Sequence, residues 1–419
     1  MGLKKEVGLL ELTLAGIGVI LGAGIYVLVG KAAGIAGDYI WVSFAAAGLI
    51  AILTGLSYAE LSARFPKAGA EYVYGKSAFG KKWAFGIGFA LLLVGIASSA
   101  TVALGFGGYF SAIFHLPSII GTMLILLLSF AVIWFGAKIS TSIAGLLSIV
   151  EIGGLLAIIF IGIPTISNGF PIPNFVIVPG ILSAAALIFF AFLGFEDLVR
   201  LSEDTKNSQK IMPIALLLAI VISTILYILV AASAVSILGG EALGQSHAPL
   251  AEVAARGFGG DAFWVLAIVA LFSTGNTVLL LLLATSRLVY GLSSEKTLPR
   301  ILGETHHSQP RNALIISTIG VGLLVLYQDI MFVAHVTDGL LFAVFAIMNA
   351  AIIKISLDDK KTFTGFKIPL RWGKIPIPAV VGSILNAGML FFVEVNALLF
   401  GIAFVFVGML GYYVWKQNE

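Results

Sequence analysis

The chain has 419 residues, of which 59% are hydrophobic and only 11% are charged, with a formal net charge of +3 and a mean hydropathy of +1.08. Soluble domains contain roughly 45–50% apolar and about 25% charged residues, so this composition excludes a soluble globular protein. Disordered and fibrous chains are excluded for the same reason, and the small net charge gives no ground for a nucleic-acid partner. The sequence has no cysteine, which excludes disulfides and thiolate metal sites.

These numbers predict an all-α polytopic membrane protein in contact with the lipid bilayer. A membrane-spanning helix needs about 20 mainly apolar residues. Stretches of this kind predict twelve transmembrane helices, over residues 10–33, 39–63, 83–110, 119–137, 141–163, 180–197, 213–237, 261–291, 312–328, 330–353, 375–393 and 396–415. The first is longer than the apolar core of a signal peptide, so we expect it to be kept. One transmembrane domain over residues 1–419 follows.

The basic residues predict the orientation of these helices. If the N-terminus is inside, all but Lys31 and Arg256 of the 24 Lys and Arg residues lie on the cytoplasmic side. Positive charges concentrate in cytoplasmic loops. We therefore expect a protein of the plasma membrane with both termini cytoplasmic, together with the polar connections 64–82, 198–212, 292–311 and 354–374.

The first predicted helix carries four glycines between Gly16 and Gly24. Each Gly costs about 1 kcal/mol relative to Ala inside a helix. One interpretation is close helix packing through Gly18 and Gly22. The other is an interruption near Gly22, Ala23 and Gly24 that presents bare backbone N–H groups to a cavity.

The sixth predicted helix has a matching feature, because Gly194 follows an aromatic run and Glu196 comes directly after it. Interrupted helices in corresponding halves of a chain are typical of inverted-repeat transporters. Their free N–H groups suit a carboxylate, whereas their free carbonyls suit an ammonium group or a cation. Together they predict a receptor for a zwitterion.

Four segments resemble the amino acid–polyamine–organocation (APC) superfamily of secondary transporters. They are the glycine-rich run from Gly16 to Tyr26, the loop from Ala63 to Tyr74, the stretch from Phe190 to Glu196 with Ser202-Glu203-Asp204 and Ile211-Met212-Pro213, and Ser286-Arg287 with Tyr290 and Leu298-Pro299. The chain departs from the family pattern at Ala70, where a glycine is usual, and at Asn207-Ser208, where Asn-Pro is common.

The resemblance implies a five-plus-five inverted repeat with broken helices 1 and 6, the LeuT-like fold. The repeats would cover residues 10–163 and 180–353, with two extra helices over 375–415. It further implies that the substrate is bound by Ile20, Gly22, Ala23 and Gly24 of helix 1 and by Ala191, Phe192 and Gly194 of helix 6. Phe192 would close over the bound substrate. A side chain at Gly24 should then block the carboxylate site while leaving the fold intact.

Carboxylates inside the membrane are expensive and therefore candidates for function. Glu151 lies ten residues into the fifth predicted helix, about 15 Å along its axis. Three roles remain open: a protonated carboxyl that carries the coupling proton, a carboxylate that binds a cation with Ser273, Thr274 and carbonyls near Val19, or a neutral carboxyl bonded to a neighbouring helix.

The other ionisable residues are weaker candidates. Glu196 would either bond the backbone freed by the sixth helix or gate the pathway, and Asp338 lies inside the tenth helix. Glu60 and Glu71 are expected to form a salt-bridged cytoplasmic gate with Arg64 and Lys67. His306 and His307 have no third ligand in view, so we expect no metal site, and no cofactor or enzymatic activity is indicated.

The sequence thus predicts a permease that transports a neutral amino acid together with protons (symport) by alternating access. Its predicted site segments are apolar and carry no charge for a charged side chain. Transport of organic amines or inorganic cations is the alternative suggested by Glu151. A membrane sensor or channel with the same fold is the rival class.

Overall fold

The computed structural model describes residues 7–66, 70–136, 141–166, 178–203, 205–294, 298–305, 309–358 and 363–417, and nearly all of them are helical. The first half contains α1 (Leu9–Ile20), α2 (Gly24–Ala36), η1 (Gly37–Tyr39), α3 (Ile40–Arg64), α4 (Ala70–Phe79), α5 (Lys81–Phe114), α6 (Ser118–Trp134) and α7 (Thr141–Ile166). The next part contains α8 (Val178–Ile188), η3 (Phe189–Phe192), α9 (Phe195–Leu198), η4 (Val199–Glu203), α10 (Ser208–Leu238), α11 (Gly240–Gln245) and α12 (Pro249–Phe258).

The remaining elements are α13 (Asp261–Ser294), η5 (Arg300–Gly303), α14 (Arg311–Val325), α15 (Ile330–Asp358), β1 (Arg371–Trp372), β2 (Ile375–Pro376), α16 (Ile377–Met389), η6 (Leu390–Phe392) and α17 (Val395–Gln417). The two short strands pair antiparallel as a hairpin. Each of the twelve predicted apolar segments falls largely on these helices. The sequence did not predict α4, α11, α12 or the hairpin, which lie in the connections between apolar segments.

Seven helical stretches within the described residues are long and apolar enough to cross a membrane, and five further apolar helices are shorter. Large apolar side chains lie exposed along these helices, among them Leu127, Phe160, Leu323 and Val407. A helical surface of this kind is favourable in contact with lipid tails and unfavourable in contact with water. The chain is therefore an integral membrane protein built mainly of helices, with one short β-hairpin.

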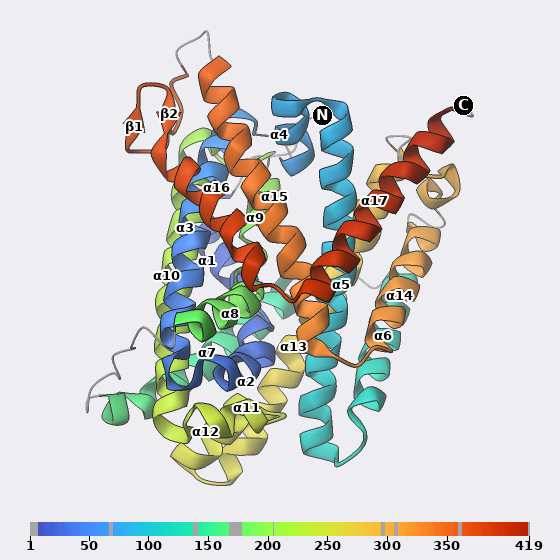
Figure 1. Ribbon diagram of the computed structural model, residues 1–419. Coiled ribbons are helices and arrows are strands. Elements are labelled where there is room, and N and C mark those ends of the chain that lie inside the picture. Colours follow the sequence, from blue (N-terminus) through green and yellow to red (C-terminus); the bar gives the residue numbers. More distant parts are fainter. Residues whose placement is uncertain are drawn as a thin grey trace.

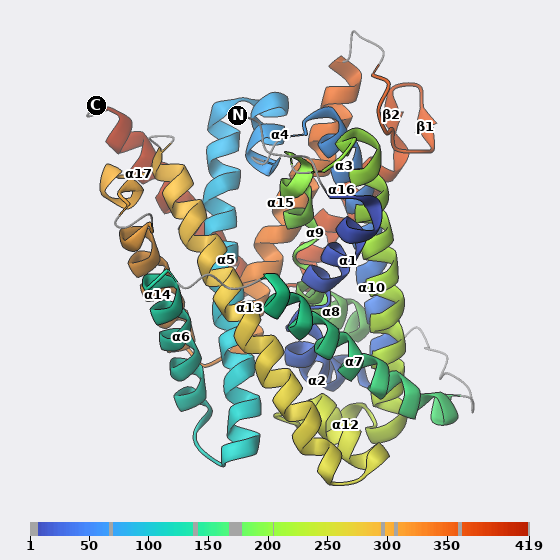
Figure 2. The same ribbon diagram turned by 180° about the vertical axis from the view of Figure 1, so that it is seen from behind.

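The two ends of the bundle differ. Both chain termini, α4 and the β1–β2 hairpin lie at one end, while α11 and α12 lie at the opposite end (Figure 1). Figure 2, seen from behind, shows α7 crossing the bundle between α13 and α10. The interrupted pairs α1–α2 and η3–α9 lie inside this frame.

Small residues allow the helices around the interruptions to approach closely. A Cβ atom added at Gly48 of α3 would lie 2.3 Å from Thr224 of α10, and one at Gly55 would lie 2.4 Å from Ile220. Contacts of this kind are how helices associate in lipid, where apolar burial alone gives no advantage. They fix α10 against α3 and so set the position of Tyr227, one turn beyond Thr224.

Candidate functional site

The first predicted helix is interrupted where the glycines occur. The helix α1 ends at Ile20, residues 21–23 are not helical, and α2 begins at Gly24. The backbone of η3 lies directly against α2, because a Cβ atom at Gly24 would stand 2.6 Å from the Cα atom of Ala191. Glycine is thus needed at position 24 for the backbones of α2 and η3 to come into contact.

The sixth predicted helix is interrupted at Leu193 and Gly194, between η3 and α9. Gly194 has a φ of +112°, a conformation that residues with a Cβ atom rarely adopt. The same glycine faces the first interruption, since an added Cβ atom would lie 2.6 Å from the side chain of Val19. The two interruptions therefore meet in space although about 170 residues separate them.

One tyrosine joins the two interruptions. The hydroxyl of Tyr227, on α10, donates to the carbonyl oxygens of Ile20 and of Ala191, the latter over 2.8 Å. Both carbonyls lie at points where a helix ends, so they have lost regular helical partners. The ring of Phe192 stands edge-on to Tyr227, with 5.3 Å between ring centroids. Tyr227 therefore ties the C-terminal end of α1 to the backbone of η3.

Glu196 forms a hydrogen bond with the backbone that is left free by the interruption of the sixth predicted helix. Its carboxylate accepts from the N–H of Gly194 over 2.9 Å, and its side chain is buried. This is the first of the two roles expected for it. The carboxylate also lies at the first turn of α9, where a negative charge is favoured by the helix dipole.

The structure brings most of the expected substrate residues together. Ile20 and Ala191 meet at Tyr227, Gly24 packs on Ala191, and Gly194 packs on Val19. Gly22 faces α13, because a Cβ atom there would lie 3.6 Å from the hydroxyl of Thr277. Ala23 and Phe192 are fully buried beside them. The arrangement contradicts one expectation: a larger side chain at Gly24 would collide with backbone, so it would disturb the fold as well as any site.

Glu151 is buried on α7 and is held from α13. The hydroxyl of Ser273 donates to its carboxylate, and the hydroxyl of Tyr26 donates to its backbone carbonyl over 2.9 Å. Among the described residues no Lys or Arg forms an ion pair with it. Thr274 does not join this group as expected, since its hydroxyl donates to the Ala270 carbonyl of its own helix.

Two ion networks lie at the end that carries the termini. Glu60 binds Arg64 as expected, and it also binds Arg371 of the hairpin and the backbone N–H of Ile368. Glu71 does not join it: Glu71 accepts from the Tyr58 hydroxyl and lies 3.7 Å from Arg200. Burial raises the pKa of Glu71, although the charge of Arg200 opposes the shift.

The remaining candidates stand apart from the interruptions. Asp338 is fully buried on α15, and neither of its carboxylate oxygens has a hydrogen-bond partner within the described part of the chain. The same residues contain no cluster of three His, Asp or Glu side chains that could hold a metal. Lys67, Asp204, His306 and His307 lie outside the described residues.

Sequence reasoning missed three hydroxyl residues of this site: Tyr26, Tyr227 and Thr277. Tyr227 is the single tyrosine of the long apolar helix α10. A buried tyrosine generally needs a partner for its hydroxyl, so its isolation was a usable signal. Nothing in the sequence identifies the carbonyls of Ile20 and Ala191 as that partner, because the contacts span 207 and 36 residues.

Comparisons with known proteins agree with this architecture. The chain matches the family described as amino acid permease over residues 7–412. It is 27% identical to the methylthioribose transporter of Bacillus subtilis, with 100% of this chain and 94% of that protein covered. It is 29% identical to the branched-chain amino acid permease BcaP of the same bacterium, over 74% of this chain and 71% of the permease.

A human relative, cationic amino acid transporter 4, is 28% identical over 78% of this chain and 55% of its own length. The relatives are transporters rather than enzymes, and the family match covers both interruptions, Glu151 and Tyr227. The chain therefore belongs to the amino acid permease family of the APC superfamily.

Proposed function

We propose that this protein is a secondary active transporter of neutral amino acids, driven by protons and working by alternating access in the plasma membrane. Its fold would comprise twelve membrane-spanning helices with both termini in the cytoplasm. Residues 10–163 and 180–353 would form two inverted five-helix repeats, and residues 375–415 would add two helices. One observation carries the proposal: two interrupted helices from different parts of the chain meet at Tyr227.

The interruptions supply the groups that an amino acid backbone requires. The N-terminal end of α2 offers backbone N–H groups and a positive dipole end to a carboxylate. The carbonyls of Ile20 and Ala191 offer acceptors to an ammonium group, and each retains capacity beyond the single proton of Tyr227. Ile20, Gly22, Ala23, Gly24, Ala191, Phe192 and Gly194 would form the substrate site.

The surroundings of this site favour a neutral substrate. Val19, Ala23, Ala191 and Phe192 are apolar, and Glu196 is engaged by the N–H of Gly194. A substrate with a cationic side chain would need a free carboxylate at the site. The candidate for that role on α7 is Glu151, the one acid in the described part of this helix. The human relative named for cationic amino acids makes this alternative worth testing directly.

Glu151 would carry the coupling proton. An ionised buried carboxylate needs a cation or several donors, and the described side chains provide one donor, Ser273. A neutral carboxyl needs no countercharge, so gain and loss of a proton would change its bonding to α13. Its backbone carbonyl is also bonded by Tyr26 of α2, which links the proton site to the interrupted helix.

Transport by purified protein in liposomes tests the function. L-Alanine, L-leucine, L-lysine and methylthioribose should be offered with an imposed pH gradient, with a sodium gradient, and as counterflow. We expect gradient-driven uptake of a neutral amino acid that is indifferent to sodium. Accumulation of L-lysine alone would contradict the neutral assignment, and an absence of counterflow with every solute would favour a sensor.

Glu151→Gln tests the coupling. It preserves size and hydrogen bonding but cannot release a proton, so pH-driven accumulation should be lost while counterflow is retained. Asp338→Asn is the matched control, since it neutralises another buried intramembrane carboxyl. If Asp338→Asn loses the gradient response and Glu151→Gln keeps it, the coupling residue has been misassigned. Sodium dependence of the wild type would favour a cation site at Glu151.

A further inference from the structure

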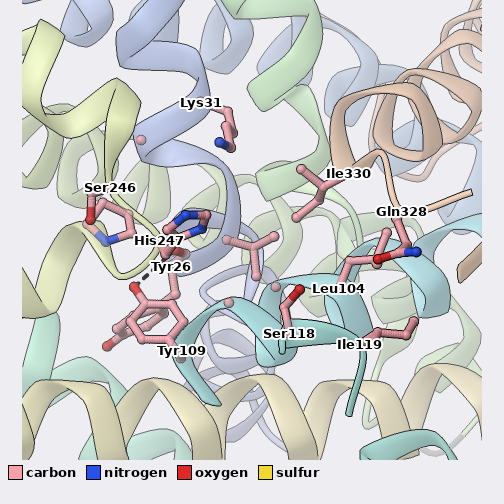
Figure 3. A pocket seen from close by; sticks show the side chains of 15 residues that line it. Tyr26, Lys31, Leu104, Tyr109, Ser118, Ile119, Ser246, His247, Gln328 and Ile330 are labelled. Carbon is pink, nitrogen blue, oxygen red and sulfur yellow. Dashed lines mark hydrogen bonds between the residues drawn. The ribbon is translucent and has the colours of Figure 1, made fainter. Parts of the chain in front are cut away.

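A cavity lies about one helical turn beyond the first interruption, beside the segment that joins α11 to α12 (Figure 3). It is lined by α2, α5, the start of α6, the segment between α11 and α12, and the turn before α15. Its polar lining side chains are Tyr26, Lys31, Tyr109, Ser118, Ser246, His247 and Gln328. None of these belongs to the substrate or coupling residues assigned above except Tyr26, which forms the floor.

The charge of the cavity is positive and uncompensated. No Asp or Glu lines it, and Lys31 forms no ion pair or hydrogen bond within the described part of the chain. The acid adjacent to the lining residue Ile330 is Asp329, which instead accepts from the N–H groups of Met331 and Phe332 at the start of α15. An anion in the cavity would therefore be attracted by Lys31 and would meet no carboxylate on the lining itself, although Glu252 acts on the lining residue Tyr109 from outside the cavity.

The position of Lys31 does not follow from a general abundance of positive charge at this end. Only Lys31 and Arg256 among the basic residues fall on this side of the predicted topology. Arg256 is exposed on α12 and does not line the cavity, whereas Lys31 is partly buried at its wall. Burying an unpaired ammonium group costs free energy. An anion bound beside Lys31 would reduce that cost.

The size of the cavity restricts the anion. Its volume is about 180 Å³, room for about six water molecules at ~30 Å³ each. That space suits a solute of about six heavy atoms, or the backbone portion of a larger one. Gly108 lets α5 approach the segment between α11 and α12 closely at the wall, since a Cβ atom there would lie 3.0 Å from the His247 carbonyl.

The floor connects the cavity with the interrupted helices. Tyr26 is fully buried, lies three residues after Ala23, and bonds the backbone of Glu151 over 2.9 Å. Tyr109 holds Tyr26 from the other side by donating to its backbone carbonyl over 3.1 Å. A solute in the cavity is thus separated from the proposed coupling site by one tyrosine ring.

We infer that this cavity is a subsite in which Lys31 holds the carboxylate of an amino acid before it reaches the interrupted helices. The role of the solute as a transport substrate rests on the proposed function, whereas the binding of a carboxylate here does not. Recognition is by the carboxylate and by size, so L-alanine is a suitable probe.

A single cysteine placed in the cavity tests the inference without any measurement of transport. The chain has no cysteine, and Ser118→Cys changes one exposed wall residue whose side chain points into the cavity across from Lys31 (Figure 3). The rate of its modification is measured in purified protein at pH 8, with an anionic and with a cationic methanethiosulfonate reagent.

We expect the anionic reagent to be favoured relative to its rate with free cysteine. Lys31→Gln should lower this preference by about threefold or more, whereas Arg256→Gln, which removes the other basic residue of this end, should leave it unchanged. L-Alanine should slow modification, and L-alaninamide, which lacks the carboxylate, should not. Chloride at the same concentration should protect less than L-alanine.

Other results would overturn the subsite. They are an equal preference for both reagents, an equal effect of Lys31→Gln and Arg256→Gln, equal protection by L-alaninamide, or full protection by chloride, which would indicate a general site for small anions. If the cavity behaves as expected while liposomes transport no amino acid, the subsite stands and the proposed function fails. The two ideas are therefore separable.

Discussion

The hydroxyl of Tyr227 has one proton and two carbonyl acceptors at the meeting point of the interruptions. Its removal leaves both buried carbonyls without this donor, and an unsatisfied buried polar group costs about 1–3 kcal/mol. We therefore expect Tyr227→Phe to lower the melting temperature of the detergent-solubilised protein and to weaken amino acid binding.

Tyr109→Phe is the control for this change. It also removes a buried tyrosine hydroxyl, but the carbonyl of Tyr26 that loses its donor lies within the continuous helix α2. Its effect on the melting temperature should be smaller. An equal or larger loss in Tyr109→Phe would show that Tyr227 does not hold the interruptions together.

Ala70 occupies a position that suits glycine better. It has a φ of +27°, in the region that residues with a Cβ atom rarely adopt, and it is fully buried at the start of α4. Such a conformation costs about 1–2 kcal/mol in a residue other than glycine. Ala70→Gly should therefore raise the free energy of unfolding by about 1 kcal/mol.

The control for Ala70 lies in the same helix. Ala78 is an ordinary helical residue of α4, so Ala78→Gly should lower stability by about 1 kcal/mol. Thermal unfolding of the two variants should therefore shift in opposite directions. Destabilisation of both would mean that the backbone at residue 70 is not strained.

At the scale of elements, the β1–β2 hairpin is fastened to the end of α3 by one buried carboxylate. Glu60 is fully buried and binds Arg64, Arg371 and the N–H of Ile368. Removing one partner of a buried ion pair leaves uncompensated charge and costs about 3–5 kcal/mol. Glu60→Gln should thus lower the melting temperature strongly.

An exposed ion pair provides the comparison. Asp197 lies 3.0 Å from Arg200, and both side chains are more than a third exposed. Pairs of this kind contribute about 0–1 kcal/mol because water and salt screen them. Asp197→Asn should therefore change the melting temperature little, and a loss as large as that in Glu60→Gln would argue against burial as the source of the effect.

At the scale of the whole molecule, the predicted topology assigns opposite sides of the membrane to the two ends of the bundle. Trp372 is exposed in the hairpin, and Gly260 has open space around it between α12 and α13. A membrane-impermeant maleimide should label Gly260→Cys in intact cells and Trp372→Cys only after permeabilisation. Labelling of Trp372→Cys in intact cells would overturn the assignment of the termini to the cytoplasm.

The sequence predicted the helices far better than the contacts between them. Apolar length identified the long helices, glycine density identified the first interruption, and Gly194 between an aromatic run and Glu196 identified the second, because each of these signals is local. The sequence placed Ser273 near Glu151 only as a further ligand of a cation, whereas in the structure the Ser273 hydroxyl donates to the carboxylate directly. The hairpin and its bond to Glu60 could not be predicted, since Arg371 and Glu60 are 311 residues apart. Tyr227, Tyr26 and Thr277 were missed for the same reason.

The contact between α2 and η3 also limits how the sequence can change over generations. A Cβ atom added at Gly24 would meet the Cα atom of Ala191 at 2.6 Å and its methyl group at 3.1 Å, so no smaller residue at position 191 makes room for it. A lineage that acquires alanine at position 24 must therefore shift the backbone of one interrupted segment against the other. Descent should thus keep glycine at position 24 whichever residue occupies position 191.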